Sequence, residues 1–326
     1  HSSGADDRVL IIGGGQAASQ TATSLRQGGH RGEITLVGDE PVPPYQRPPL
    51  SKAYLKGEIG PERLFFRPAA AYADMGVTLK TGLSALGIDR AQRQAQLSDG
   101  TTCGYDRLVL ATGARARRLK CEGSDLQGVL ELRTLADTDK LAPYMKPGAR
   151  IVIIGAGYIG LEAAAVARTL GLEVTVLEMA SRVLARVAVP QMSDFFEHWH
   201  RAQGVTILTG AHLAGFIGEK GQISGVQLAD GRTLACDLAL VGIGIEPNDA
   251  LARQAGLTAK DGIYTDRDGR TSDPRIFAAG DCARRPLIHY AREGRLESVH
   301  NAIEQGKLVA AAILGLPRPA EDVPWF

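Results

Sequence analysis

The chain carries one short pattern twice: an apolar run that ends in closely spaced glycines and leads into a helix-like segment. The first copy reads VLIIGGGQAASQ at residues 9–20, and the second reads IVIIGAGYIGLEA at residues 151–163. Each copy predicts a buried strand, over 8–14 and 150–157, and then a helix, through about residue 27 and over 158–171. A further strand follows each helix, at 33–38 and 173–178. The recurrence predicts a duplicated domain built from βαβ units with parallel sheets.

Three further apolar segments define the expected domain organisation. DRLVLATGA at 106–114 and CDLALVGIG at 236–244 each run from an Asp through a strand to a Gly, which predicts two crossovers between domains. TSDPRIFAAGDCA at 271–283 predicts a return to the first domain. We therefore expect an α/β fold of two Rossmann-like domains, the second inserted into the first, with segments 5–115, 116–246 and 247–326. The Pro-rich segment at 41–49 is expected to be an ordered loop or a lid, because proline disrupts helices and central strands.

Composition and charge argue against several classes of function. The 37 basic and 36 acidic residues among 326 give a net charge of +1, so we expect no nucleic-acid partner. No apolar run is long enough to span a membrane, so we expect no membrane association. The four cysteines form no C-x-x-C pair and have no histidine at metal-ligand spacing, so we expect neither a metal site nor a disulfide framework. Reduced cysteines are typical of a cytoplasmic protein.

The second glycine motif has every part of a dinucleotide-binding site. Gly155 permits a tight turn, Gly157 allows the backbone to approach a pyrophosphate, and Gly160 allows the helix to pack close to the strand. The helix N-terminus attracts phosphates. Glu178 ends the next strand, where its carboxylate can bind a ribose 2′-hydroxyl and repel a 2′-phosphate, which favours NADH over NADPH. Arg182 is close enough to weaken that preference. The alternative is a structural turn in an α/β protein.

The first motif departs slightly from this pattern. It places Ala18 at the third glycine position, after Gly13 and Gly15. Asp39 is our candidate for the adenosine ribose, although Asp39 and Glu40 could simply belong to a turn. Two dinucleotide sites in one chain suit hydride transfer, which needs a donor and an acceptor. If one site holds NAD(P)H, we expect the other to hold a flavin dinucleotide.

Six blocks of the sequence are informative together: GGGQAASQTATSLR, PYQRPPLSKAYL, LVLATGARAR, IVIIGAGYIGLEAAA, VLARV and TSDPRIFAAGDCA with ESVHNAIEQG. They resemble the flavin-dependent NADH:ferredoxin reductases of the putidaredoxin-reductase and rubredoxin-reductase type, and the resemblance covers about residues 5–326. It implies a glutathione-reductase-like flavoprotein that binds FAD and NADH. It implies a ferredoxin-type [2Fe–2S] protein or a rubredoxin as partner, in chains that feed cytochromes P450 or dioxygenases, and a monomer or homodimer. Family members continue past EDVPWF at 321–326 into a third domain, which we expect to be absent here.

The resemblance also assigns residues to each cofactor. FAD is expected to contact Gly13, Gly15, Ala17, Asp39, Arg47, Lys52, Ala85, Thr112, Gly113, Arg133, Gly280, Asp281 and Val299. NADH is expected to contact Gly155, Gly157, Tyr158, Ile159, Gly160, Glu178, Arg186 and Gly242. Lys52 and Glu162 are the expected catalytic pair, in which an ammonium beside the flavin stabilises its electron-rich reduced form. The alternatives are an ordinary exposed lysine and a solvated helix glutamate.

Other readings remain open. His300 could relay a proton beside the flavin, although a packed or solvated histidine is the commoner case. The basic run Arg115, Arg117, Arg118 and Lys120 could steer an acidic ferredoxin, or could be a solvated crossover. A disulfide reductase or NADH oxidase on the same scaffold needs a cysteine beside the flavin, and residues 5–102 contain none. A slow-turnover NADH-binding flavoprotein sensor is the third possibility.

Overall fold

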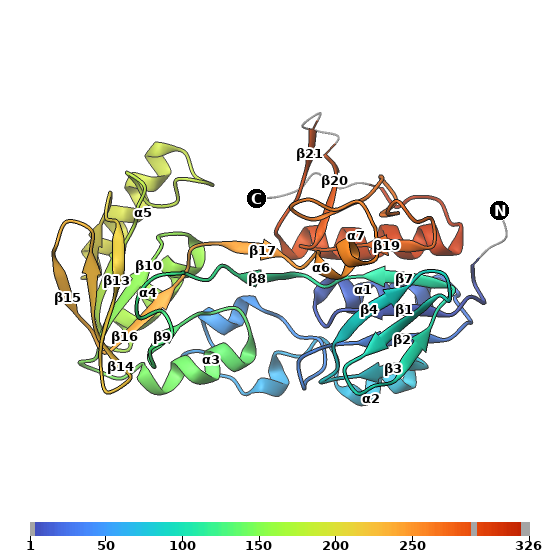
Figure 1. Ribbon diagram of the computed structural model, residues 1–326, viewed down its shortest axis with the longest axis horizontal. Coiled ribbons are helices and arrows are strands. Elements are labelled where there is room, and N and C mark those ends of the chain that lie inside the picture. The colour runs from blue at the N-terminus through green and yellow to red at the C-terminus, as the bar shows by residue number, and fades with distance from the viewer. Residues whose placement is uncertain (1–3, 288–291, 321–326) are drawn as a thin grey trace. The chain divides into compact units, whose positions relative to one another are not determined.

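The chain divides into two compact units in a computed structural model that describes residues 4–287 and 292–320 (Figure 1). The first unit comprises residues 1–46, 65–115 and 246–326, and the second comprises 47–64 and 116–245. The expected α/β fold, with a second Rossmann-like unit inserted into the first, is confirmed. One segment differs from the bounds drawn from the sequence. Residues 47–64 pack with the second unit, because Leu55 is buried in its apolar core.

A five-stranded parallel sheet is the framework of the first unit. Its strand order is β19–β7–β1–β2–β3. These strands span Val9–Ile12 (β1), Ile34–Val37 (β2), Val77–Lys80 (β3), Arg107–Leu110 (β7) and Ile276–Ala278 (β19). β1 and β2 are buried along their whole length, as is typical of parallel strands covered on both faces.

Two helices of the first unit, α1 (Gln16–Gln27) and α7 (Val299–Leu314), run side by side (Figure 1). Their close approach depends on Gly306, where an added Cβ would lie 2.9 Å from the Cβ of Gln20. The short helices α2 and α6 span Ala69–Asp74 and Ala250–Gln254. Two small sheets complete the unit: β4 (Ala85–Asp89), β5 (Gln94–Leu97) and β6 (Thr102–Gly104), and β18 (Ile263–Tyr264), β20 (Ala283–Leu287) and β21 (Arg292–Gly294).

The second unit repeats this plan. Its parallel sheet has the order β12–β11–β10–β16–β9, with strands Val129–Leu130 (β9), Arg150–Ile154 (β10), Glu173–Leu177 (β11), Thr206–Leu208 (β12) and Leu238–Val241 (β16). Its helices are α3 (Leu135–Leu141), α4 (Tyr158–Thr169) and α5 (Pro190–Ala202), with 3₁₀ turns η1 (Pro48–Ser51), η2 (Pro61–Arg63) and η3 (Ala142–Tyr144). An antiparallel sheet joins β13 (Leu213–Glu219), β14 (Gln222–Leu228) and β15 (Thr233–Ala235).

Both expected crossovers are present. They continue into β8 (Ala114–Ala116) and β17 (Ile245–Pro247), which pair as a two-stranded sheet. The Pro-rich segment is an ordered loop, anchored by a bridge between Tyr45 and Phe65, and it enters η1 at Pro48. Within residues 4–287 and 292–320, none of the helices combines the length and the apolar character that crossing a membrane requires. The expectation that a third domain is absent concerned the segment at residues 321–326. This segment lies outside the described residues.

Candidate cofactor sites

The expected flavin residues of the first unit follow the carboxyl ends of its parallel strands. Gly13 follows β1, Asp39 follows β2, Thr112 and Gly113 follow β7, and Gly280 follows β19. Because these strands are adjacent and parallel, their carboxyl ends meet at one edge of the sheet. In open α/β sheets this edge binds the ligand.

The turn after β1 requires glycine at its first position. Gly13 has φ +141°, and an added Cβ would lie 1.9 Å from the carbonyl oxygen of Ala111. α1 begins directly after Gly15, and an added Cβ on Gly280 would lie 3.0 Å from the Cβ of Ala17. The structure therefore brings Ala17 and Gly280 together. The N–H of Gly280 donates to Gln305 Oε1 at 2.5 Å, which fixes this turn to α7.

The remaining flavin candidates of the first unit lie in different settings. Thr112 and Gly113 are fixed by Asn248, whose Nδ2 donates to the Thr112 carbonyl at 2.9 Å and whose N–H donates to the Gly113 carbonyl at 2.9 Å. Asp39 is exposed. Its neighbour Glu40 accepts a hydrogen bond from the Tyr45 hydroxyl at 2.5 Å, so Asp39 is the better candidate for a ribose.

The start of α7 and the turn before it carry the other candidates. Val299, the first residue of α7, exposes 45% of its surface, which suits an apolar contact with a ring. The Nε2 of His300 is buried and has no hydrogen-bond partner among the described residues. Asp281 is half-buried, and its carbonyl accepts a hydrogen bond from Arg295 at 3.1 Å. Ala85, at the start of β4, is half-buried against the core.

The second unit reproduces the glycine turn at the end of β10. Gly155 has φ +102°, and an added Cβ would lie 2.1 Å from the carbonyl oxygen of Gly242, which follows β16. An added Cβ on Gly160 would lie 2.3 Å from the carbonyl oxygen of Gly155, so this glycine allows α4 to pack against the turn. Gly155 and Gly160 therefore need to be glycine for the protein's own packing.

Gly15 and Gly157 need glycine for a different reason. Each is the N-cap of its helix, with φ −111° and −82°, which any residue can adopt. Of the 39 glycines, only these two combine such a backbone with open space, because no protein atom lies within 4 Å of the Cβ position. Because glycine has no side chain, neither N-cap residue has a side-chain acceptor for the first N–H groups of its helix. A phosphate-bearing ligand fits both positions.

Glu178 directly follows β11, where its carboxylate lies against the glycine turn. Oε1 accepts a hydrogen bond from the N–H of Ala156 at 3.4 Å, and Oε2 from the N–H of Ala180 at 3.3 Å. Arg182 is engaged elsewhere: Nη1 donates to the Ala188 carbonyl and to Ser193 Oγ, both at 2.6 Å. These bonds use donors with which Arg182 would bind a 2′-phosphate.

Three further NADH candidates present exposed surface. Tyr158 and Ile159, in the first turn of α4, are exposed beside the open Gly157 position. Arg186 is exposed, and its Nη1 lies 3.2 Å from the position of an added Cβ on Gly244, two residues after Gly242.

The expected catalytic pair lies within the second unit. Lys52 Nζ is 3.3 Å from Glu162 Oε1, with 55% and 32% of the two side chains exposed. Lys52 follows η1, and Glu162 lies in the second turn of α4. The other two flavin candidates of this unit are also joined, because Arg47 Nη1 donates to the Arg133 carbonyl at 2.7 Å.

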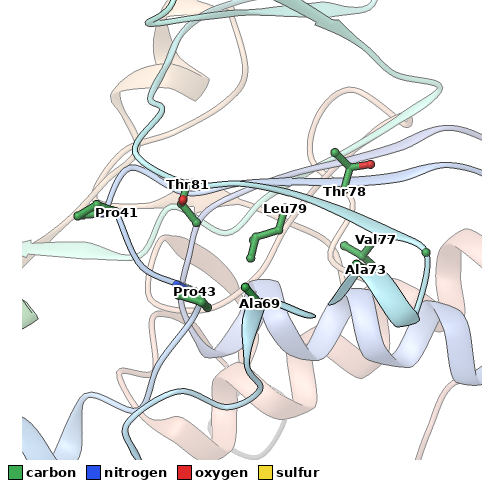
Figure 2. A pocket seen from close by; sticks show the side chains of 9 residues that line it. Pro41, Pro43, Ala69, Ala73, Val77, Thr78, Leu79 and Thr81 are labelled. Atoms are coloured by element: carbon green, nitrogen blue, oxygen red, sulfur yellow. The ribbon is translucent and has the colours of Figure 1, made fainter. Parts of the chain in front are cut away.

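A cavity of ≈ 640 Å³ lies elsewhere, at the edge strand of the first unit. Figure 2 shows Pro41 and Pro43 facing Ala69 of α2 and Leu79 of β3 across it. None of its lining residues is among the cofactor candidates, so this cavity does not mark either dinucleotide site.

Comparison with known proteins shows the family to which this chain belongs. The model of the pyridine nucleotide-disulphide oxidoreductases matches residues 7–306. The chain belongs to this family. It is 45% identical to "Probable ferredoxin reductase CtmF" of Castellaniella defragrans, over 99% of this chain and 79% of that protein. It is 39% identical to a rubredoxin-NAD(+) reductase of Pseudomonas putida, over 98% of this chain and 83% of the relative.

A solved structure agrees with these relatives. The crystal structure of the covalent putidaredoxin reductase–putidaredoxin complex matches with a TM-score of 0.96 and 43% identity, over 98% of this chain and 78% of that one. The resemblance drawn from the sequence, to ferredoxin reductases of the putidaredoxin-reductase and rubredoxin-reductase type, is confirmed.

The cysteines of this oxidoreductase are not arranged for disulfide exchange. All four are free, and Cys236 and Cys282 are buried. Burial raises the pKa of the Cys236 thiol to about 11 and raises that of Cys282, which disfavours the reactive thiolate. Among the described residues there is also no cluster of three or more His, Cys, Asp or Glu side chains that could hold a metal ion.

The basic run is partly neutralised by nearby carboxylates. Arg115 pairs with Glu246 at 2.9 Å, and Arg118 lies 3.8 Å from Glu131. Arg118 is nevertheless 83% exposed. Its side chain remains available to an acidic partner, and partner steering by this run stays a prediction.

Two residues of these sites were missed by sequence reasoning. Asn248 fixes the turn after β7 from far along the chain, and Ser51 donates a hydrogen bond to Glu162 Oε2 at 2.7 Å. Asn248 lies in none of the blocks that carry the resemblance, and Ser51 lies in the block PYQRPPLSKAYL without a role of its own assigned there. The only sequence signal for Ser51 is that it precedes Lys52.

Proposed function

We propose that this chain is an NADH-dependent flavoprotein reductase that passes a hydride from NADH to FAD and then single electrons to a ferredoxin-type [2Fe–2S] protein or a rubredoxin. The observation that carries the proposal is the repeated helix N-terminus, open at Gly15 in one unit and at Gly157 in the other. We assign FAD to the segments 5–115 and 247–326 and NADH to the segment 116–246.

The first unit fits a dinucleotide with a ribityl chain and a ring. The N–H groups at the start of α1 bind the pyrophosphate, and Asp39 binds the adenosine ribose. The turn that Gln305 fixes at Gly280 presents Asp281 to the ribityl chain, and Val299 contacts the ring. FAD, when bound, supplies a ring that accepts two electrons together and releases them one at a time.

The second unit fits NADH. The start of α4 binds its pyrophosphate, and Tyr158 and Ile159 cover it. The Glu178 carboxylate accepts hydrogen bonds from the ribose hydroxyls and repels the 2′-phosphate of NADPH. Because Arg182 Nη1 donates to the Ala188 carbonyl and to Ser193 Oγ, fewer of its N–H groups are free to bind a 2′-phosphate directly.

Lys52 provides the positive charge that the reduced flavin needs. Its ammonium is held by the Glu162 carboxylate at 3.3 Å. A fixed charge placed where negative charge develops stabilises the product of hydride transfer without a large rearrangement. Lys52 and Glu162 are therefore the residues on which we expect the hydride-transfer rate to depend most.

The names of the relatives support the class of electron acceptor. They are reductases of ferredoxin, rhodocoxin, putidaredoxin and rubredoxin. Exposed arginines such as Arg118 attract an acidic partner and raise the rate of encounter. We infer that the reaction takes place in the cytoplasm, in a monomer or homodimer.

Disulfide reduction on the same scaffold is less well supported. It requires a cysteine beside the flavin, and residues 5–102 contain none. Cys282, the cysteine that follows Asp281, is buried, and its thiol donates to the carbonyls of Leu110 and Ala279 at 3.4 Å each.

The experiment that tests the proposal measures electron delivery. Protein reconstituted with FAD is mixed with NADH, cytochrome c and a [2Fe–2S] ferredoxin, and cytochrome c reduction is followed. We expect a rate that rises with ferredoxin concentration and is larger with NADH than with NADPH. A flavin-loaded protein whose rate does not depend on ferredoxin would instead support a sensor or an oxidase.

A further inference from the structure

Residues 47–58 form a rigid platform on the second unit. Two hydrogen bonds fix it: from Arg47 to the Arg133 carbonyl at 2.7 Å and from the Tyr54 hydroxyl to Asp139 Oδ1 at 2.6 Å. Thr138 Oγ1 also lies 3.4 Å from the Leu50 carbonyl, and it is equally far from the Thr134 carbonyl. Apolar side chains add to this, because Leu50 and Leu55 are buried. The backbone that carries residues 51 and 52 is therefore fixed relative to α3 and α4.

Two neighbouring residues of this platform share the Glu162 carboxylate. Ser51 Oγ donates to Oε2 at 2.7 Å, and Lys52 Nζ lies 3.3 Å from Oε1. Each oxygen thus has a partner of its own. The Ser51 hydroxyl is also 3.3 Å from the Pro48 carbonyl, but the shorter distance and the negative charge of Glu162 favour donation to the carboxylate.

The two partners differ in how firmly they are held. Ser51 is 2% exposed, with a short side chain on fixed backbone, whereas the Lys52 side chain is 55% exposed and flexible. An exposed ion pair alone orders its side chains weakly. A buried hydroxyl at 2.7 Å from a carboxylate orders it much better, because hydrogen bonds to charged groups are strong and directional. The orientation of Glu162 therefore comes mainly from Ser51.

We propose that Ser51 is a positioning residue: its hydroxyl fixes one oxygen of Glu162 so that the other oxygen holds the Lys52 ammonium in place. The inference rests on the proposed function, because the position of that ammonium matters only if it faces a flavin that becomes electron-rich. Removing the hydroxyl lets the carboxylate turn, and Lys52 then loses its fixed partner. The effect on electron transfer passes through Glu162 and Lys52.

The test begins with protein free of cofactor. Urea unfolding is measured for Ser51→Ala, for Glu162→Gln and for the double variant. We expect Ser51→Ala to lower the urea midpoint of the protein that retains Glu162. In the Glu162→Gln variant the same substitution should lower the midpoint less, because the charge-assisted hydrogen bond is already lost there. If the shifts in urea midpoint of the two single variants add up to the shift of the double variant, the proposed interaction between Ser51 and Glu162 would be overturned. This readout does not depend on flavin or NADH.

The second readout is anaerobic flavin reduction by NADH in the FAD-loaded protein. We expect Ser51→Ala to slow reduction about tenfold, which corresponds to losing one hydrogen bond to a charged group, with an unchanged KM for NADH. We expect the midpoint potential of the flavin to be more negative in the Ser51→Ala variant than in the wild type, as we also expect for Lys52→Ala. In a Lys52→Ala background, Ser51→Ala adds no further loss. A merely structural role would slow reduction equally in both backgrounds.

Thr138→Val is the matched control. It removes a buried hydroxyl beside the same platform, which lies 3.4 Å from the Leu50 carbonyl and equally far from the Thr134 carbonyl, and which does not contact Glu162. We expect it to leave the reduction rate unchanged, and a loss equal to that of Ser51→Ala would overturn the proposal. If Ser51→Ala does not fold, Ser51→Cys keeps the side chain's shape with a weak donor and should slow reduction in the same way.

The outcomes separate this inference from the proposed function. If the wild-type flavoprotein is not reduced by NADH, the proposed function fails, while the urea measurements still decide whether Ser51 holds Glu162. If the wild type is reduced and Ser51→Ala is reduced at the same rate, only the role of Ser51 is overturned.

Discussion

Substituting Gly157 by alanine should weaken NADH binding without harming the fold. An added Cβ at this position meets no protein atom within 4 Å, and the backbone φ of −82° suits alanine. Replacing glycine at a compatible φ stabilises a protein by about 0.4–1 kcal/mol, and alanine is a poorer N-cap than glycine by a similar amount. We therefore expect the free energy of unfolding to change by less than about 1 kcal/mol.

The expected loss in NADH affinity follows from the same geometry. The new methyl carbon stands about 1.5 Å from Cα, in the space where a phosphate approaches the first N–H groups of α4. Displacing the phosphate removes at least one hydrogen bond to a charged group, each of which contributes about 1.5–3 kcal/mol. The Kd for NADH should therefore rise about 10–100-fold.

Gly15→Ala and Gly155→Ala are the informative comparisons. Gly15 is equally open, so its substitution should weaken FAD binding and leave the Kd for NADH unchanged. Gly155→Ala should also destabilise folding, because φ is +102° and the Cβ would lie 2.1 Å from the Gly242 carbonyl oxygen. Isothermal titration with NADH and urea unfolding give both quantities. A Gly157→Ala protein that folds and binds NADH with wild-type affinity would refute the assignment of this helix N-terminus.

Three further outcomes are expected. Lys52→Ala should slow flavin reduction by NADH at least about tenfold in stopped flow, because a fixed charge is lost, and unchanged traces would return Lys52 to an ordinary surface role. Glu178→Gln should raise the kcat/KM for NADPH relative to NADH about tenfold, because repulsion of the 2′-phosphate is removed, and an unchanged ratio would contradict that role. Burial lowers the pKa of the His30 and His200 imidazoles in the folded protein. The unfolded chain therefore takes up these protons first, so stability present above about pH 6.5 is lost as the pH falls below it. The urea midpoint should fall between about pH 7 and about pH 5.5, and less so in a His30→Leu, His200→Leu double variant.

The sequence predicted the two sheets and their glycine turns because those features are local. An apolar strand, a glycine at a strained φ such as Gly13 or Gly155, and an amphipathic helix follow one another within about twenty residues. The order of the crossovers then required an inserted unit. The same local logic placed Glu178 at the end of β11, beside the glycine turn.

What the sequence did not reveal depends on contacts between distant segments. Residues 47–64 pack with the second unit through Leu55 and a few hydrogen bonds, none of which has a periodic signature. The bond from Ser51 to Glu162 joins residues 111 positions apart. The engagement of Arg182 with Ser193 depends on the path of the chain before α5. Spacing along the chain cannot report such pairings, because tertiary packing sets them.

The central claim is that electrons enter from NADH, pass through a flavin and leave to an iron–sulfur partner. Anaerobic addition of one equivalent of NADH to FAD-loaded protein, followed by oxidised [2Fe–2S] ferredoxin, tests it most directly. We predict that the flavin absorbance bleaches on the first addition and returns on the second, as the ferredoxin spectrum becomes that of the reduced protein. A flavin that NADH leaves oxidised, or one that stays bleached in the presence of ferredoxin, would contradict the account.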